Sequence, residues 1–364
     1  MPKYFLYQHT QLKDYIISYF NFLGVPQTDS ETIADVLLEA DLRGVSSHGI
    51  IRLNTYYGNR ILAGDIKAVT KVTNVHETAT TLLLDGGNGM GHVAGKHAME
   101  QCIEKAGTTG LGMVTVRNSN HYGIAGYYAM MALQHDMIGI SYTNSLPLVA
   151  PTYGKTAILG TNPIAVAVPA GTQRPYVLDM ATSIVPIGRM TVYDKAGQPI
   201  PEGWGINAEG KVTTAPADVL HGGALMPLGG IDLMRGYKGY GLAMMVDIFS
   251  GILSGSAYAN LVARWEEGEG AKVGHFFMAV DINAFRPAQE FKQDMDDYIQ
   301  LLKHAPKAAG QERIYIPGEK EDENYAKNIK NGIPLLEEVV SSLQRDCTAK
   351  GFPFTPEPVG TIED

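Results

Sequence analysis

One short segment combines side chains that could move a proton and hold a carboxylate. It contains Ser47-His48-Gly49, with Arg52 four residues after the histidine and Tyr56 four residues further on. An imidazole can serve as a general base or acid, and a guanidinium binds a carboxylate through paired hydrogen bonds. If Ser47 caps a helix, His48 lies in its first turn, where the positive helix end favours a neutral ring. The intervals of four then place Arg52 and Tyr56 on the same helical face.

These groups suit the oxidation of a 2-hydroxy acid or the reduction of a 2-oxo acid. Such a reaction needs a base for the hydroxyl proton, a cation for the carboxylate and a nicotinamide for the hydride. The spacing is also compatible with a capped surface helix that carries a solvated histidine and arginine. From spacing alone, both interpretations remain open.

A second histidine, His121, lies in the segment Asn118–Gly123, between a predicted strand and a predicted helix. Ligands in open sheets bind at such strand ends. His121 is therefore either catalytic or the partner of a buried carbonyl group, and its position alone favours neither. The other histidines lack the spacing of metal ligands, so no metal site is predicted.

The motif Gly89-x-Gly91-x-x-Ala94 matches the dinucleotide fingerprint, because it follows a predicted strand and opens a predicted helix. However, the next strand ends without the acidic residue that would bind the ribose. Arg117 stands at that strand end and could bind a 2'-phosphate, so NADP stays open as a cofactor. The chain also does not continue as repeated βα units, which argues against a Rossmann domain.

The elements that would position these side chains are helices at both chain ends and a mixed α/β middle. Apolar periodicity and breaker residues predict the following terminal helices: 12–23, 33–42, 47–62, 289–304 and 333–347. In the middle they predict strands at 80–84, 112–116, 138–142, 165–168, 176–179 and 275–280, and helices at 93–106, 123–133 and 240–253. We expect a helical domain from residues 1–75 with 285–364, an α/β domain from 76–284, and a loosely ordered tail from 355.

Composition narrows the function classes. The chain has 364 residues, is 45% hydrophobic and carries a formal net charge of −9. This charge disfavours nucleic acid and anionic membranes as partners. The most apolar stretch, 239–262, contains Asp247 and several glycines, which indicates a buried helix rather than a membrane span. Two distant cysteines provide no disulfide framework, so a reduced cytoplasmic location is expected.

Several long motifs together resemble the malate/L-lactate dehydrogenase family, whose members bind their cofactor without a Rossmann fold. The motifs lie at 40–49, 118–123, 160–163, 179–183, 201–204, 237–241 and 317–319, so that the resemblance spans about residues 10–350. Two features depart from the pattern. Ser46 stands where many members have Asp, and the segment 231–235 is unusual before the Lys238 motif.

The resemblance implies an α/β fold with a mixed, largely antiparallel sheet domain and a helical domain from both chain ends. It also implies that Gly89-x-Gly91 is a structural turn. His48 would be the catalytic acid or base and His121 a second catalytic histidine, and members differ in which one accepts the proton. Substrate would be held by Ser47, Arg52 and Tyr56. The implied cofactor-binding residues are Ser145, Asp179, Met180, Ala181, Thr182, Ser183, Lys238, Gly318 and Glu319.

We therefore expect a homodimeric oxidoreductase that transfers a hydride between NAD, or alternatively NADP, and a small 2-hydroxy or 2-oxo acid. Malate and oxaloacetate are the preferred pair. Lactate, ureidoglycolate, sulfolactate or a cyclic imine would fit the same fold. A binding protein that keeps the cofactor pocket but lacks activity is the alternative from another functional class.

Overall fold

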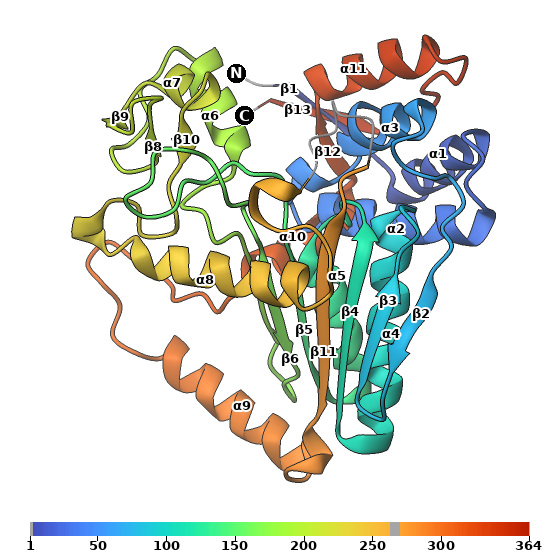
Figure 1. Cartoon of the computed structure of the whole chain (residues 1–364), viewed down its shortest axis with the longest axis vertical. Helices are drawn as coiled ribbons and strands as arrows, with labels where there is room; N and C mark the ends of the chain where they lie inside the picture. Colours follow the sequence, from blue (N-terminus) through green and yellow to red (C-terminus); the bar gives the residue numbers. More distant parts are fainter. Residues whose placement is uncertain (1–2, 263–269, 364) are drawn as a thin grey trace.

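A seven-stranded sheet forms the centre of the computed structural model, which describes residues 3–262 and 270–363 (Figure 1). Its strands lie in the order β2 (Thr73–Glu77), β3 (Thr81–Asp85), β4 (Leu111–Ser119), β11 (Val273–Asp281), β5 (Met137–Thr143), β6 (Ile164–Val168) and β7 (Tyr176–Met180). Only the β3–β4 pair of this sheet is parallel. The expected mixed, largely antiparallel sheet is therefore confirmed.

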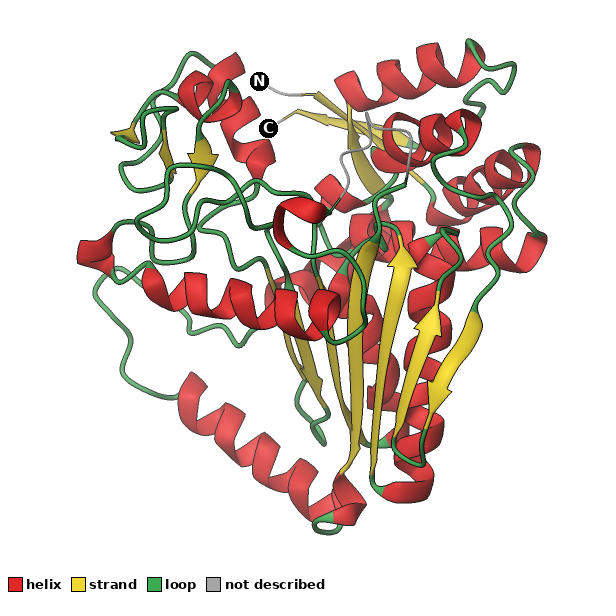
Figure 2. Cartoon of the chain, in the orientation of Figure 1, coloured by secondary structure: helices red, strands yellow, loops and turns green. Residues whose placement is uncertain are grey.

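Both faces of this sheet are covered, because successive side chains of each strand point to opposite sides. Phe277 of β11 packs in a core that includes residues of α4 (Gly91–Thr109) and α5 (Ala125–Met131). The neighbouring Phe276 instead contacts Phe249, in the π-helical segment η5 (Ile248–Ile252) that continues α8 (Tyr237–Asp247). Figure 2 shows α4 beside the strands and α8 crossing in front of them.

The Gly89-x-Gly91 motif is explained by close packing at the start of the parallel β3–α4–β4 crossover. A Cβ at Gly91 would overlap the carbonyl oxygen of Asn120, and one at Gly89 would collide with Thr70. Arg117, considered above for a 2'-phosphate, instead pairs with Asp85 across the parallel strands, with 3.0 Å between Nε and Oδ2. The glycines therefore allow a tight turn against the next loop.

Residues from both chain ends share one hydrophobic core, in which α1 (His9–Phe22) and α2 (Gln27–Leu42) pack with α11 (Glu337–Thr348). Beside it lies a small antiparallel sheet in the order β12 (Ile333–Leu336), β1 (Lys3–Tyr7) and β13 (Gly360–Glu363). Two predictions were wrong here. The helix expected from residue 333 begins at Glu337, and the tail expected to be loose forms β13. Both segments pair with β1, a distant partner that local sequence patterns do not reveal.

The remaining elements flank the sheet, and the division into two domains stays a prediction. A lobe with little regular structure contains α6 (Ile187–Lys195), β8 (Gly205–Ile206), β9 (Val212–Thr213), α7 (Pro216–Leu220) and β10 (Ala224–Leu225). The helices α9 (Ala288–Lys303) and α10 (Glu319–Asn331) follow β11. The carboxylate of Asp296 in α9 accepts hydrogen bonds from three backbone amides of the β6–β7 turn, which ties this helix to the sheet.

Within the described residues, no helix is long and apolar enough to cross a membrane.

The continuous helix predicted for residues 47–62 was wrong. Instead the chain forms a short 3-10 helix, η1 (Ser46–His48), a π-helical segment, η2 (Leu53–Gly58), and α3 (Asn59–Ala63). The break follows from buried Asp41, whose carboxylate accepts the Ile50 amide hydrogen at 2.7 Å and occupies the space where Gly49 would carry a Cβ. Ser47 is therefore not a helix cap.

Candidate active site

Two histidine rings from separate parts of the chain stack against each other. His48 ends the 3-10 helix η1, and His121 follows strand β4. Their ring centroids lie 5.4 Å apart, with 20° between the ring planes. Both side chains are half-buried, which leaves part of each ring open to a small ligand.

Arg52 and Tyr56 reach the same place, although the helix between them and His48 is not continuous. The Tyr56 ring centroid lies 5.2 Å from that of His121, and the Arg52 guanidinium carbon lies 5.8 Å from the Tyr56 centroid. Arg52 donates from Nε to the Ser47 carbonyl at 2.8 Å. No other described residue accepts a hydrogen bond from Arg52, so its two terminal nitrogens are available for a carboxylate.

Tyr57 also belongs to this cluster, and sequence analysis missed it. Its hydroxyl oxygen lies 2.6 Å from Nδ1 of His121, and its side chain is fully buried. In a regular α-helix, neighbouring residues such as Tyr56 and Tyr57 point in clearly different directions. Here both rings nevertheless approach His121, with centroids 5.2 and 5.9 Å from it, and they meet each other edge to face at 5.1 Å. Only the tyrosine pair itself could have drawn attention to this residue.

Burial keeps both imidazoles neutral at physiological pH. It lowers the pKa of His48 to about 4, and the positive charge of Arg52 adds to this effect. Burial, followed by the charges of His48 and Arg52, lowers the pKa of His121 well below its usual value. His48 is therefore neutral as expected, but the cause is burial rather than the positive end of a helix. Exposed Ser47 contacts His48, with 2.9 Å between its Oγ and Nδ1.

A hydrogen-bonded network joins several of the predicted cofactor residues. Ser145 Oγ accepts the Thr161 amide hydrogen at 3.0 Å, and Thr182 donates its amide hydrogen to the Thr161 carbonyl at 2.8 Å. The Thr182 carbonyl in turn accepts the Leu228 amide hydrogen at 2.8 Å. Helix α8 packs directly against this network, since Gly239, next to Lys238, lies so close to Leu228 that a Cβ there would collide with it. The motifs around Thr161, Thr182 and Lys238 therefore meet, although they are distant in the sequence.

The segment Asp179–Ser183 connects this network to the histidine pair. The carboxylate of Asp179 accepts the Gly126 amide hydrogen at 2.7 Å, at the start of the helix that follows His121. Met180 and Ala181 are half-buried, and Ser183 donates its hydroxyl hydrogen to the Val185 carbonyl. Lys238 is exposed on α8. Asp179 therefore joins strand β7 to the start of the helix that follows His121.

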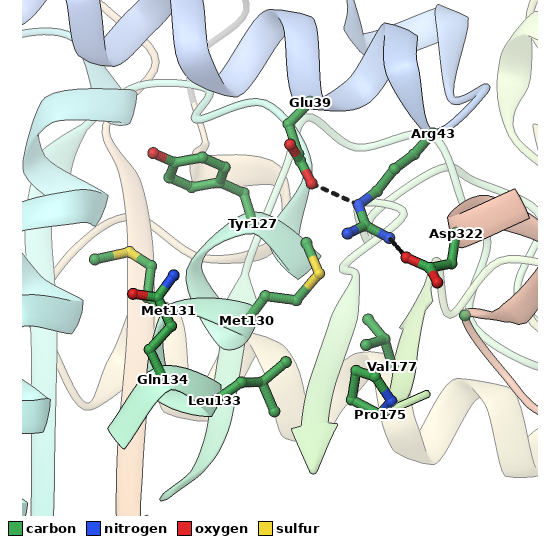
Figure 3. Close-up of a pocket in the computed structure, with 11 residues that line it drawn as sticks. Glu39, Arg43, Tyr127, Met130, Met131, Leu133, Gln134, Pro175, Val177 and Asp322 are labelled. Carbon is green, nitrogen blue, oxygen red and sulfur yellow. Dashed lines mark hydrogen bonds and ion pairs between the residues drawn. The ribbon is translucent and has the colours of Figure 1, made fainter. Parts of the chain in front are cut away.

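Gly318 borders a cavity of about 360 Å³ between α2, α5, β7 and α10. Figure 3 shows Arg43 at its rim, paired with Glu39 and Asp322, and the apolar side chains of Met130 and Val177 facing the opening. Its lining residues are Glu39, Arg43, Tyr127, Met130, Met131, Leu133, Gln134, Pro175, Val177, Gly318 and Asp322. The cavity adjoins the strand that leads to Asp179, and its size and mixed lining fit one part of a dinucleotide.

The neighbouring Glu319 has its carboxylate bound within the protein. It pairs with Lys303 at 2.6 Å and with Arg313, and it accepts the Ile316 amide hydrogen at 3.1 Å. Its backbone is engaged as well, since the Glu319 amide donates to the Ile316 carbonyl at 3.0 Å and its carbonyl accepts from Arg174 at 3.3 Å, so this residue stabilises the turn. No group of histidine, cysteine or carboxylate side chains within residues 3–262 and 270–363 could hold a metal ion.

Comparisons with known proteins agree with this geometry. A family model described as malate/L-lactate dehydrogenase matches residues 7–344. Malate dehydrogenase from Pyrococcus horikoshii is 49% identical over 334 residues, which cover 92% of each chain. L-sulfolactate dehydrogenase from Methanocaldococcus jannaschii is 38% identical over 93% of this chain and 96% of its own.

Solved structures extend the similarity to the fold. Malate dehydrogenase from Pyrococcus horikoshii superposes with a TM-score of 0.89 and 44% identity, covering 98% of this chain and 97% of that one. Malate dehydrogenase from Entamoeba histolytica superposes with a TM-score of 0.91 and 37% identity, covering 97% and 99%. The similarity thus spans both the central sheet and the terminal helices.

Proposed function

Because the chain belongs to the malate/L-lactate dehydrogenase family, we propose that it interconverts malate and oxaloacetate by hydride transfer with a nicotinamide cofactor. The observation that carries this proposal is the stacked pair His48 and His121 beside Arg52. Two neutral imidazoles and a guanidinium with available donors are what a 2-hydroxy acid requires.

In this mechanism Arg52 binds the carboxylate next to the reacting carbon, which brings the substrate oxygen to the imidazole pair. An imidazole accepts the hydroxyl proton during oxidation and returns it during reduction. Tyr56, half-buried against His121, covers one side of the substrate. The nicotinamide, when bound, supplies the hydride acceptor.

For the cofactor we propose NAD, with NADP as the alternative. The residues that would hold it are Ser145, Asp179, Met180, Ala181, Thr182, Ser183, Lys238 and the turn at Gly318 and Glu319. Relatives differ in this respect. One from Escherichia coli is named ureidoglycolate dehydrogenase (NAD(+)), and one from Chromohalobacter salexigens is named (2R)-3-sulfolactate dehydrogenase (NADP(+)).

We further propose that the enzyme is a cytoplasmic homodimer. An apolar stripe on α8 and η5 supports the dimer, since Met244, Ile248 and Ile252 are 41, 46 and 54% exposed at helical intervals. The buried free cysteines Cys102 and Cys347 are compatible with a reducing compartment. Light scattering after gel filtration should give twice the chain mass of 39.4 kDa, and introducing Ile248→Glu should yield monomers.

A panel of 2-oxo acids tests the proposed activity. Oxidation of NADH and of NADPH is followed with oxaloacetate, pyruvate, sulfopyruvate and a cyclic imine carboxylate. We expect the highest kcat/KM with oxaloacetate. Sulfopyruvate is the second candidate, because a relative from Methanothermus fervidus is named malate/(S)-sulfolactate dehydrogenase. Absence of turnover with every compound would refute the proposal.

A further inference from the structure

The two groups that face Nδ1 of His121 define which ring nitrogen carries its proton. The backbone amide of Gly123 points at Nδ1 from 3.3 Å, and the Tyr57 hydroxyl lies 2.6 Å away. A backbone N–H can only donate, so Nδ1 must be the acceptor. The Tyr57 hydroxyl therefore donates as well. A neutral His121 then carries its single proton on Nε2.

We propose that Tyr57 is a positioning residue that holds His121 in this tautomer and thereby divides the work between the two histidines. This proposal rests on the proposed function. His121 donates a hydrogen bond from Nε2 to the substrate oxygen, and His48 accepts the hydroxyl proton. Sequence motifs alone leave the two rings equivalent, whereas the contacts of Tyr57 distinguish them.

The surroundings of Tyr57 keep its hydroxyl protonated and in place. Its ring is fully buried and makes edge contacts with Phe20 and His92, at centroid distances of 6.4 and 4.7 Å. Burial raises the pKa of Tyr57 well above its usual value. The hydroxyl is therefore a permanent donor, and the packing prevents the ring from turning away from His121.

His48 has the complementary arrangement. Its Nδ1 faces Ser47 Oγ at 2.9 Å, and its Nε2 has no hydrogen-bond partner within the described part of the chain. When Nδ1–H donates to Ser47, Nε2 is bare and can accept a proton. During oxidation the substrate O–H bond breaks and the proton moves to this nitrogen. The electron pair left on oxygen forms the C=O bond as the C–H bond breaks and its hydride passes to the proposed nicotinamide acceptor. His121 keeps its own proton throughout.

Nitrogen-15 NMR of histidine-labelled protein without substrate or cofactor tests the tautomer directly. At pH 7.5 we expect His121, assigned by its loss in His121→Gln, to show a protonated Nε2 and an unprotonated Nδ1. Tyr57→Phe leaves only the longer contact of 3.3 Å from the Gly123 amide to favour this tautomer, so both shifts should move part of the way toward a mixture of tautomers. The matched control is Tyr19→Phe, because Tyr19 is equally buried and donates its hydroxyl to Asn54 of the same segment η2 at 2.7 Å. This control should leave both shifts unchanged.

Two results would overturn the proposal: a wild-type His121 protonated on Nδ1, or a Tyr57→Phe spectrum identical to that of the wild type. In the kinetic arm, loss of one orienting hydrogen bond should lower kcat about 5- to 10-fold and leave KM nearly unchanged. Tyr19→Phe reports any general loosening of η2. Because the NMR experiment needs no turnover, it still reads the tautomer if the substrate panel fails, so the two failures are distinguishable.

Discussion

The histidine pair and the Glu319 turn contain motif residues of the same family, but their polar atoms are used differently. At the histidine pair, Nε2 of His48 makes no hydrogen bond to any described residue, and two nitrogens of Arg52 are likewise available. At the turn, the Glu319 carboxylate is bound by Lys303 and Arg313 and by a backbone amide. The family motifs therefore contain both residues that would react and residues that support the fold. The two kinds differ in whether their polar atoms already have hydrogen-bond partners within the protein.

The two regions also differ in charge. Burial keeps the imidazoles neutral, whereas the Glu319 carboxylate is ionised despite its burial. Although desolvation opposes its charge, the hydrogen bonds from Lys303, the Ile316 amide and Arg313 hold the pKa of Glu319 below its usual value. Changes at the first region should thus act on the reaction, and changes at the second on stability.

The largest effect is expected from His48→Gln. Removing the proton acceptor should lower kcat for malate oxidation about 100-fold or more, because a positioned general base contributes roughly 10²–10⁴. The melting temperature should change little. The matched control is His76→Gln, an exposed histidine on β2, which should keep wild-type kinetics. Unchanged turnover in His48→Gln would mean that the unused ring nitrogen has no catalytic role.

The second prediction concerns Glu319→Gln. Removing the charge of this buried carboxylate, whose partners Lys303 and Arg313 are partly exposed, should lower the free energy of unfolding by about 2 kcal/mol, while kcat at saturating cofactor stays near wild type. Urea denaturation at pH 7 measures the loss, with exposed Glu338→Gln as the control. Since the folded-state pKa of Glu319 is lowered, this stabilisation is present above its unfolded pKa and disappears as the pH falls through the folded value. If Glu319→Gln were fully stable but had little activity, Glu319 would act on the reaction rather than on stability.

The sequence predicted six of the seven strands of the central sheet and the residues of the histidine pair, because these follow local patterns or long motifs. It missed β2, whose side chains are all exposed and therefore show no apolar alternation. It could not predict the break between His48 and Arg52, which depends on the Asp41 carboxylate taking the space beside Gly49. Nor could it predict that Tyr57 contacts His121, because that contact joins residues that are 64 positions apart in the chain.

Two further features were hidden for other reasons. Strand β1 pairs with segments from the opposite end of the chain, so the contacts that define the small sheet are non-local. Helix α10, of sequence EKEDENYAKNIKN, is so rich in charged residues that its apolar face consists of little more than Tyr325 and Ile329, which is too short to predict a helix. The motifs were therefore enough to identify His48 and Arg52 as candidate site residues. The contacts that bind the Glu319 carboxylate could be identified only in the structure.

The third prediction concerns Arg52→Gln. Loss of a charge-assisted pair with the substrate carboxylate should cost about 2 kcal/mol, which corresponds to a roughly 30-fold rise in KM for oxaloacetate. The KM for the nicotinamide should not change, and Arg345→Gln, on the exposed surface of α11, is the control. An equal rise in both KM values would place Arg52 at the cofactor rather than at the acid, and would contradict its assignment to the substrate.

The smallest effect is expected in the pH dependence of malate oxidation. The reaction needs unprotonated His48, whose pKa is lowered to about 4 by burial and then by Arg52. The proton acceptor is therefore available at all pH values above about 4, and kcat/KM, which reports the free enzyme, should stay flat from pH 8 through 6.5 to about 5. Arg52→Gln removes the lesser cause, so its acid limb should move to higher pH but remain below 6.5, because burial persists. If kcat/KM of the wild type instead fell with a midpoint near pH 6.5, His48 would be solvated like an ordinary surface histidine. The statement that burial keeps the imidazoles neutral, unlike the charged Glu319 carboxylate, would then be wrong.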